Sequence, residues 1–538
     1  MQRSTKHLLA TCGLASIAVA GVANADNNWT SSGHDIQNTR NQNNENRISV
    51  DTVAALAVKW IHTTAGDVSA TPAVDGSRVY FPDWAGNLSA VDRKTGQLLW
   101  QTSIAAASGV PFDKARATPL VVGDKVIVGT QGSILVPGGG PGGKLLAFDK
   151  STGAILWATQ LDSHPAAIVT QAATAHGGRV YVGVASQEEA LAGFVSGYPC
   201  CNFRGSLLSL DVDTGAILWK TYMVPDEPGY SGNAIWGSAP AIDTKRKQVY
   251  VATGNNYSVP QAVLDCVDAA GDDPDAIQAC VDPTSLFDSI VALDYNTGAI
   301  KWATRALPYD AWTVSCIPFL GDGSNCPEPA GPDYDFGQAP ALFTVEMQGK
   351  PRQLVGAGQK SGQYWALDPD TGQVIWVSQA GPGGTAGGLQ WGSAVDGERI
   401  YTANANYNVT PWTLPDGTVT LAGMWTALDA ATGAILWQTA DPGPDSAPLI
   451  PGFPQTGFGS ASGPVSTANG VVFGCSLDAA GHMYALDAAT GEVLWSFASG
   501  GSCLSGAAIS NGEVYWGSGY GNFGFGTPNN KLYAFELP

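Results

Sequence analysis

The stretch Ala90-Val91-Asp92-Arg93-Lys94-Thr95-Gly96-Gln97-Leu98-Leu99-Trp100 decides the fold, because its pattern recurs along the chain. An apolar strand ends at the Asp, the Thr-Gly pair supplies a turn with Gly at a position of positive φ, and a second strand runs to the Trp. The pattern is Ala-x-Asp-x-x-Thr-Gly-x-x-x-Trp, with Ser209 replacing the Ala once. Its later copies end at Trp157, Trp219, Trp302, Trp376, Trp437 and Trp495.

Most copies are preceded by a further pair of predicted strands, such as residues 71–80. This gives about four strands per repeat. Four-stranded repeats at this spacing are typical of propeller blades. An eighth blade has to be assembled from both ends, because residues 56–60 resemble the end of a repeat and residues 531–536 its beginning. We therefore predict an all-β, eight-bladed β-propeller in which the repeated tryptophans pack between blades.

Composition and charge exclude several classes of partner. The chain has 538 residues, of which 13% are charged, and a formal net charge of −20. An acidic surface without a basic stripe does not bind nucleic acid or anionic lipid. After the N-terminal region, no segment has the roughly 20 apolar residues that a membrane helix needs.

The N-terminus has the pattern of a signal peptide. Arg3, Lys6 and His7 give a basic start, residues 8–22 are apolar, and residues 23–25 form a small-x-small cleavage site. We expect residues 1–25 to be removed and residues 26–538 to form a single propeller domain. The expected location is periplasmic or secreted.

The cysteines indicate an oxidising compartment. Cys12 leaves with the signal peptide, and the remaining eight of the nine form an even set, which predicts four disulfides. Spacing favours a bond within residues 266–280 and another within 316–326, with Cys475 and Cys503 left over, although other pairings stay open. No C-x-x-C-H sequence is present, so no covalent haem is expected.

Candidate functional residues lie where the repeat is interrupted. Glu188 and Glu189 follow one predicted strand, Asn255 follows another, and Asp310 lies shortly after a repeat tryptophan. Carboxylate and amide oxygens of this kind suit calcium. Each residue taken singly is also compatible with an ordinary loop position.

Two further features stand out. Trp236 lies outside the repeat pattern beside Gly237, which leaves room for a planar ring against the indole, although a core aromatic explains it equally well. Cys200 and Cys201 are adjacent, and a bond between neighbours often marks a functional site. Alternatively, each of them pairs elsewhere, or the pair only stiffens a loop.

The repeats resemble those of the PQQ-dependent alcohol dehydrogenases, and the resemblance covers nearly the whole mature chain. The opening residues 29–40 are similar as well, so the propeller is expected to have quinoprotein tryptophan-type repeats. Residues 34–40, 199–205 and 310–312 are most similar to the branch that oxidises polyvinyl alcohol. The resemblance implies pyrroloquinoline quinone (PQQ) and a Ca²⁺ ion as cofactors.

The resemblance also implies roles for individual residues. Trp236 would be the floor on which PQQ stacks, and Lys360 would contact its quinone oxygens. Glu189, with Glu188 as the alternative, would bind the metal together with Asn255 and Asp310. Other cofactor contacts would come from Arg116, Thr170, Ser186, Cys200, Cys201, Gln390 and Trp391.

Two departures from the family pattern stand out. The adjacent cysteines precede Arg204, whereas those of the methanol-oxidising branch lie in an earlier blade, and the other departure concerns the catalytic base. The family's base follows the Trp of a His-Asp-x-Trp-Asp pattern, and here Thr313 stands in that position, so Asp310 is the candidate base. Members that use lanthanides carry a further Asp two residues after the base. None follows Asp310, which favours calcium.

The expected activity is oxidation of a secondary alcohol, such as polyvinyl alcohol, to a ketone, with electrons passing to a separate soluble cytochrome c. The substrate would be an alcohol, and it would be a polymer if it is polyvinyl alcohol. The alternatives are a PQQ dehydrogenase for another alcohol or a sugar, and a non-enzymatic propeller that acts as a scaffold in outer-membrane assembly.

Overall fold

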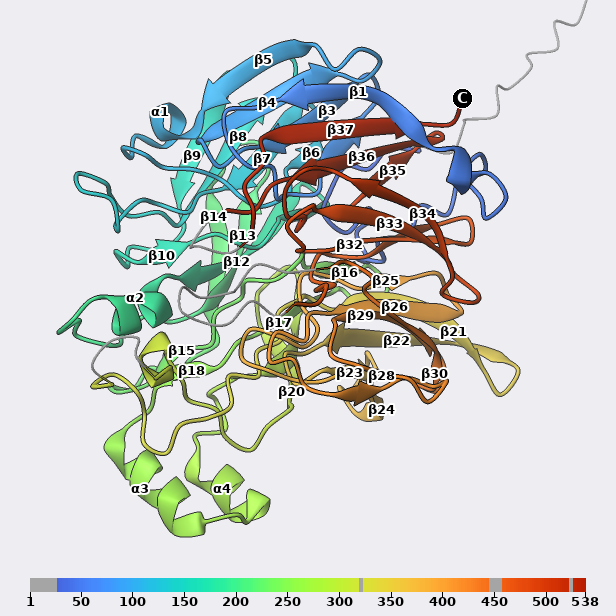
Figure 1. The fold of residues 1–538 in the computed structure, drawn as a ribbon. Coiled ribbons are helices and arrows are strands. Elements are labelled where there is room, and N and C mark those ends of the chain that lie inside the picture. The colour runs from blue at the N-terminus through green and yellow to red at the C-terminus, as the bar shows by residue number, and fades with distance from the viewer. Residues whose placement is uncertain (1–26, 319–322, 445–456, 522–525) are drawn as a thin grey trace, which may run out of the picture.

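The computed structural model describes residues 27–318, 323–444, 457–521 and 526–538. The predicted signal peptide, residues 1–25, lies outside the described residues. Among the described residues, the main sheets are seven four-stranded antiparallel sheets and one with a fifth strand. In Figure 1 they follow one another from blue through green and yellow to red, so that the first and last strands meet. This arrangement confirms the predicted eight-bladed propeller.

The first four blades follow in chain order. The first contains β2 (Ala73–Asp75), β3 (Arg78–Pro82), β4 (Asn87–Asp92) and β5 (Leu98–Ser103), and the second β6 (Leu120–Val122), β7 (Lys125–Gly129), β8 (Lys144–Asp149) and β9 (Ile155–Gln160). The third contains β11 (Thr174–His176), β12 (Arg179–Ser186), β13 (Ser206–Asp211) and β14 (Ile217–Tyr222), with β10 (Ala167–Ile168) beside β12. The fourth contains β16 (Ala241–Asp243), β17 (Gln248–Ala252), β19 (Ser289–Asp294) and β20 (Ile300–Arg305).

The remaining blades close the ring. The fifth contains β21 (Ala341–Met347), β22 (Lys350–Gly358), β23 (Gln363–Leu367) and β24 (Val374–Gln379), and the sixth β25 (Ala394–Val395), β26 (Arg399–Asn404), β29 (Met424–Asp429) and β30 (Ile435–Ala440). The seventh contains β31 (Ser466–Ala468), β32 (Val471–Cys475), β33 (His482–Asp487) and β34 (Val493–Ala498). The eighth contains β35 (Ala508–Ser510), β36 (Glu513–Ser518), β37 (Lys531–Glu536) and β1 (Ala57–Thr63).

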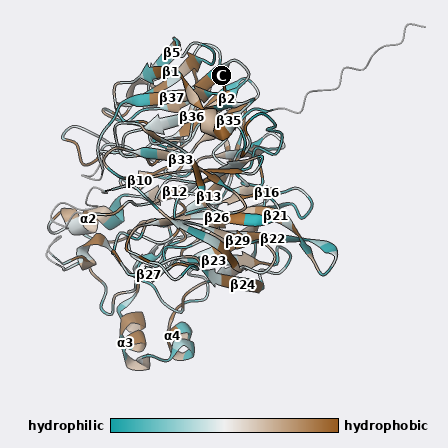
Figure 2. Ribbon diagram, turned by 45° about the vertical axis from the view of Figure 1, so that its right-hand side comes forward, coloured by the Kyte–Doolittle hydropathy of each residue, from teal (hydrophilic) through white to brown (hydrophobic). Residues whose placement is uncertain are grey.

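Helices and short ribbons occur mainly in the insertions. The helices are η1 (Val53–Ala55), α1 (Ile104–Ser108), α2 (Glu188–Phe194), α3 (Gln261–Ala270), α4 (Pro274–Cys280) and η2 (Val314–Cys316), and the ribbons are β15 (Ser231–Gly232) with β18 (Asn256–Ser258) and β27 (Trp412–Thr413) with β28 (Val419–Thr420). The hairpin α3–α4 projects from the stack of sheets at the bottom of Figure 1. Its α3 is amphipathic and carries both colours in Figure 2, with Val263 and Val267 buried.

The repeat motif joins each blade to the next. In the first blade, Asp92 Oδ1 accepts hydrogen bonds from the amide and the hydroxyl of Thr95, each at 2.9 Å. Gly153 of the following turn has φ +73°, and a Cβ atom there would lie 2.5 Å from the ring of Trp100. The indole nitrogen of Trp100 donates to the carbonyl of Lys150 at 3.1 Å. Gly is therefore required by both the turn and the tryptophan, which confirms the packing role of the repeated Trp.

The two ends of the chain close the ring, as predicted. Strand β1 pairs with β37, and Trp60 lies opposite Ala534. The indole nitrogen of Trp495, in the seventh blade, donates to the carbonyl of Leu56 at 3.0 Å. The interlocking between blades thus continues across the junction, and the eighth blade shares its strands between the two ends of the chain.

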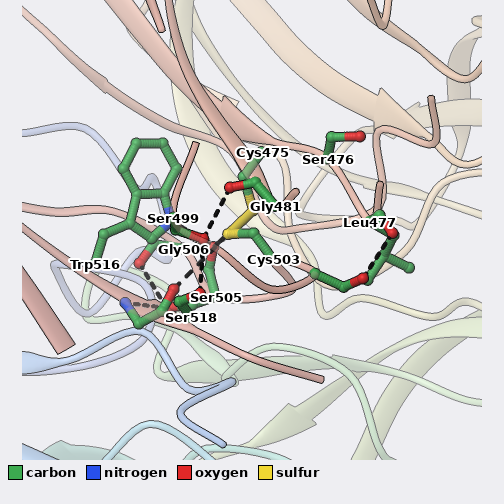
Figure 3. Close-up of a disulfide and its surroundings, with 12 residues drawn as sticks. Cys475, Ser476, Leu477, Gly481, Ser499, Cys503, Ser505, Gly506, Trp516 and Ser518 are labelled. Atoms are coloured by element: carbon green, nitrogen blue, oxygen red, sulfur yellow. Dashed lines mark hydrogen bonds between the residues drawn. A yellow bond between two sulfur atoms is a disulfide. The ribbon is translucent and has the colours of Figure 1, made fainter. Parts of the chain in front are cut away.

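The four disulfides follow the pairs that spacing favoured. They are Cys200–Cys201, Cys266–Cys280, Cys316–Cys326 and Cys475–Cys503. Figure 3 shows Cys475, at the end of β32, bonded to Cys503, which precedes β35. Beside it the indole nitrogen of Trp516 donates to Ser505 O at 2.7 Å, and Ser505 Oγ donates to Ala70 O at 2.7 Å. These contacts join the seventh, eighth and first blades.

Candidate active site

One cavity of about 320 Å³ collects most of the predicted cofactor residues. Seven of the nine line it, namely Arg116, Thr170, Ser186, Trp236, Lys360, Gln390 and Trp391. Glu189, one of the predicted metal ligands, lines it as well. These residues come from loops between strands of different blades, so the propeller brings together side chains that are more than 200 residues apart in the sequence.

Aromatic rings form much of the cavity wall. The rings of Trp236 and Trp391 meet edge to face, with centroids 5.3 Å apart. The guanidinium of Arg116 lies 4.7 Å from the ring centroid of Trp391, 5.5 Å from that of Trp84 and 5.7 Å from that of Tyr520. Within the described chain Arg116 forms no ion pair, so its charge is held by aromatic faces and is available to an anionic ligand.

Lys360 and Asp335 form the charged end of the cavity, and Asp333 pairs with Lys360 without lining the cavity itself. Lys360 Nζ lies 2.8 Å from Asp333 Oδ1 and 3.2 Å from Asp335 Oδ2. The indole nitrogen of Trp236 donates to the same Asp335 oxygen at 3.0 Å. Burial favours the neutral amine, but the carboxylates outweigh it and raise the pKa of Lys360. The lysine is therefore a fixed positive charge beside the indole of Trp236.

The two candidate glutamates have different surroundings. Glu188 is buried, and its carboxylate accepts the amides of Asn202 and Phe203, at 3.0 and 2.7 Å, and the hydroxyl of Tyr198 at 3.2 Å. Glu189 instead borders the cavity. Burial raises the pKa of Glu189 to about 8, although Lys360 acts in the opposite direction. The geometry thus gives Glu188 a structural role in holding residues 198–203 and leaves Glu189 as the cavity carboxylate.

Asn255 carries a buried oxygen that has no hydrogen-bond partner. Its side-chain nitrogen donates to the carbonyls of Asn256 and Trp312, at 3.0 and 2.8 Å, which fixes the amide and identifies Oδ1 as the free end. Its backbone amide donates to Asp335 Oδ1 at 2.7 Å. A buried, unsatisfied amide oxygen is costly unless it binds a ligand such as a cation.

The oxygen atoms of the predicted metal ligands do not form a complete coordination shell for a cation. Among the described residues, no three acidic, His or Cys side chains converge closely enough to hold a metal ion by themselves. A cation held by Glu189 and Asn255 would therefore also need oxygens from a bound cofactor.

Asp310 is buried and serves the backbone. Its Oδ2 accepts the amide of Tyr334 at 2.7 Å, and its Oδ1 accepts the amide of Asp333 at 3.2 Å. Burial raises the pKa of Asp310 to about 6. Neither Asp310 nor Asp333 lines the cavity, in contrast to Asp335.

The same contacts show that residues 313–332 are an insertion. The amide of Gly331 donates to the carbonyl of Ala311 at 2.8 Å, so the chain leaves after Trp312 and returns beside it. The returning segment lies beside the outgoing one: the amides of Asp333 and Tyr334 donate to the carboxylate of Asp310, and Asp335 follows two residues after Asp333. The sequence interpretation considered only Thr313 and Asp310 at this point, and the structure adds two aspartates, Asp333 and Asp335, that pair with Lys360.

Cys200 and Cys201 are not among the residues that line the cavity. Cys200 lines a neighbouring pocket, and Cys201 packs against the core cluster that includes Phe203 and Tyr257. The predicted contact of this pair with the cofactor is therefore not seen in the cavity.

Several cavity residues were missed by the sequence reasoning. Besides Asp335 they include Tyr257, Tyr407 and Tyr520. Asp288 was missed too; it is fully buried behind the site, and burial followed by the charge of Asp310 raises its pKa. A signal existed only for Asp333-Tyr334-Asp335, which follows the disulfide-closed insertion. The tyrosines have no distinguishing pattern.

Comparison with known proteins agrees with this geometry. A family described as "Outer membrane protein assembly factor BamB" matches residues 52–304 and 421–536. A polyvinylalcohol dehydrogenase of Pseudomonas sp. is 31% identical over 95% of this chain and 77% of that protein, and one of Sphingopyxis sp. (strain 113P3) is 30% identical over 96% and 77%. The crystal structure of quinohemoprotein alcohol dehydrogenase from Comamonas testosteroni superposes with a TM-score of 0.69 at 19% identity, over 96% of this chain and 81% of that one.

The fold and the cavity define a β-propeller with a ligand site built from loops of several blades. The chain belongs to the quinoprotein alcohol dehydrogenase family, and it is an oxidoreductase of that class. None of the helices in the described part of the chain is long and apolar enough to cross a membrane.

Proposed function

We propose that the protein is a dehydrogenase that uses PQQ and a bound cation to oxidise secondary alcohols, such as polyvinyl alcohol, to ketones. The observation that carries the proposal is one cavity in which the indole of Trp236, an arginine without an ion pair in the described chain and the Lys360–Asp335 pair converge. A planar, anionic quinone fits this set of groups, because Trp236 offers a stacking face and Arg116 pairs with a carboxylate.

Each cavity group has a distinct part in the proposed reaction. PQQ would supply a two-electron acceptor when bound, and Glu189 and Asn255 would help to hold a cation that would supply Lewis-acid chemistry beside it. Lys360 holds its charge at the end of the cavity and orients the carboxylates of Asp333 and Asp335. The aromatic walls exclude water from the reacting groups.

The proposed base is Asp333, which takes the hydroxyl proton of the alcohol at Oδ2. Its Oδ1 accepts Lys360 Nζ at 2.8 Å, and the structure shows no protein partner for Oδ2 among the described residues. Asp310, the base expected from the sequence, has both oxygens occupied by backbone amides of residues 333 and 334. It therefore acts as a positioning residue that holds Asp333.

Calcium remains the proposed cation, because Glu189, Asn255 and a quinone offer the hard oxygen atoms that it prefers. Asp335 provides an observation in favour of a second candidate. It adds a carboxylate two residues after the proposed base, which is the feature that the family resemblance associates with lanthanides. The extra negative charge suits a trivalent ion.

The proposed acceptor and location follow from the family resemblance. Electrons would leave to a soluble cytochrome c, the acceptor expected from that resemblance. A periplasmic or secreted location is proposed from the N-terminal pattern and from the four disulfides, which are typical of oxidising compartments. Polyvinyl alcohol is proposed as substrate because the two relatives with about 30% identity carry that name.

The test is dye-linked oxidation by the purified mature protein, with PQQ and with Ca²⁺ or La³⁺ added separately and together. Polyvinyl alcohol, 2-butanol, ethanol and glucose serve as substrates. The proposal expects activity that requires both PQQ and a cation and ranks the secondary alcohols first. A preference for La³⁺ would select the second candidate for the metal, and a preference for glucose would reject the substrate. No PQQ binding and no activity would leave the non-enzymatic scaffold.

A further inference from the structure

A second pocket, of about 300 Å³, lies directly beside the central cavity. Tyr257 lines both spaces and is almost fully buried, with 2% of its surface exposed. Its ring stacks on Phe203, with centroids 6.4 Å apart. Tyr257 is thus a wall shared by the site of the proposed reaction and the neighbouring pocket.

The walls of this second pocket come from three insertions, each containing a disulfide. Cys200 belongs to the insertion that contains the Cys200–Cys201 bond. Cys326 belongs to the insertion that contains the Cys316–Cys326 bond. Gln261 and Leu264 lie on α3, which the Cys266–Cys280 bond joins to α4. None of these segments belongs to the blade repeat. Three separate departures from the repeat therefore meet at one place, which a scaffold alone does not require.

Hydrogen bonds hold two of these insertions together. The side-chain nitrogen of Asn325 donates to the carbonyls of Ala192 and Tyr198, both at 3.1 Å. The hydroxyl of Thr313 donates to the carbonyl of Asn325 at 2.9 Å. Helix α2 also packs closely on η2, since a Cβ atom at Gly193 would lie 2.7 Å from a methyl carbon of Val314. The pocket is therefore fixed before any ligand arrives.

The lining combines short apolar surfaces with neutral hydrogen-bonding groups. Val259 and Leu264 supply the former, and Gln261 and Asn325 the latter. The described lining contains no Lys or Arg, and Glu328 is its one acidic residue. Such a surface suits a neutral chain in which methylene and hydroxyl groups alternate and disfavours an anionic ligand.

We propose that this pocket binds the part of an extended, hydroxylated chain that flanks the carbinol being oxidised in the central cavity. It selects polymeric alcohols over small ones, and the inference rests on the proposed alcohol oxidation. Because Tyr257 lines both spaces, one chain can place its reacting carbinol near Lys360 and its flanking segment in the second pocket.

The test fills the pocket from its exposed side. Gln261 lies at the start of α3 and is exposed, so Gln261→Trp places a large ring over the pocket without disturbing the core. Gln278→Trp is the matched control, since Gln278 is also exposed, lies on α4 of the same hairpin and does not line the pocket. Both variants and the wild type are assayed as cofactor-loaded enzyme with polyvinyl alcohol and with 2-butanol.

We expect Gln261→Trp to lower kcat/KM for polyvinyl alcohol about tenfold, mainly through KM, while kcat/KM for 2-butanol stays within about twofold. Gln278→Trp should match the wild type on both substrates. An equal loss on both substrates, or no loss on the polymer, overturns the proposal.

A binding measurement separates this inference from the proposed function. Calorimetric titration with polyvinyl alcohol oligomers, without an electron acceptor, needs no turnover. Binding to the wild type that Gln261→Trp weakens supports the pocket even if no alcohol is oxidised, in which case only the proposed reaction fails. No binding to the wild type, or equal binding to both proteins, overturns the pocket.

Discussion

Asp333 and Asp310 have contrasting environments at the scale of single residues. Asp333 pairs with Lys360 and keeps one oxygen without a protein partner, whereas Asp310 uses both oxygens on backbone amides. A group that takes a proton from substrate needs a free oxygen, and a group that positions the backbone does not. The exchange of a carboxylate for an amide should therefore affect the two residues differently.

Asp333→Asn should lower kcat by about 10²-fold or more, because the amide cannot accept the alcohol proton. Asp310→Asn should lower kcat less, since its amide oxygen still accepts one of the two backbone hydrogen bonds. Steady-state kinetics on a secondary alcohol, with PQQ content measured by absorbance, checks both. The opposite order, with both variants fully loaded, would return the role of base to Asp310.

At the scale of the element, the joint between neighbouring blades depends on glycine. Gly153 has positive φ, and a Cβ atom there would collide with the ring of Trp100. Gly153→Ala should thus add a steric cost to the cost of positive φ, which is itself about 1–2 kcal/mol for a non-glycine residue. Gly123→Ala is the matched control, because Gly123 has φ +58° and no atom within 4 Å of the added Cβ.

We expect Gly153→Ala to lower the midpoint of thermal unfolding clearly more than Gly123→Ala does. Scans at one heating rate compare the two variants fairly, because large proteins often unfold irreversibly. Equal shifts would show that the contact between Gly153 and Trp100 adds nothing beyond backbone strain.

The sequence predicted the elements well where the signal is local. The Asp, Thr-Gly and Trp of each repeat lie within one hairpin and its contact with the next blade, so their spacing suffices to predict the propeller and its closure by residues 56–60 and 531–536. The candidate site depended on features that spacing does not encode. Insertion 313–332 separates Asp333 from Asp310 in the sequence, although the amide of Asp333 donates to Asp310 in the structure.

Two other predictions about the site depended on orientation. Glu188 and Glu189 are neighbours at the start of α2, and successive helical residues point about 100° apart. Only the phase of α2 decides which of them borders the cavity. The location of Cys200 likewise depends on how three insertions pack together, and no repeat constrains that packing.

At the scale of the whole molecule, an ion-pair cluster joins the two ends of the chain. Glu513 on β36 pairs with Lys59 on β1 and with Arg93 of the first blade, the latter at 2.6 Å. Lys59 also lies 2.9 Å from Glu536. Burial acts to raise the pKa of Glu513, but these cations and the hydroxyl of Tyr515 outweigh it and lower the pKa below its usual 4.5.

This shift makes ring closure depend on pH. A carboxylate whose pKa is lower in the folded state stabilises the fold above its unfolded pKa and loses that contribution as pH falls through the folded value. Glu513→Gln should therefore cost about 2 kcal/mol of unfolding free energy near neutral pH, because Arg93 loses its ion-pair partner and Lys59 keeps only Glu536. The difference from the wild type should shrink progressively below about pH 4.5.

The exposed pair of Glu398 with Arg399 supplies the control, since Glu398→Gln removes a carboxylate that is 81% exposed. Exposed pairs contribute about 0–1 kcal/mol, so this variant should unfold close to the wild type at every pH. Denaturant unfolding of the three proteins at several pH values between 3 and 8 measures the effect. A Glu513→Gln deficit that stays constant down to pH 3 would mean that lost packing, and not the charge of Glu513, stabilises the junction between the two ends of the chain.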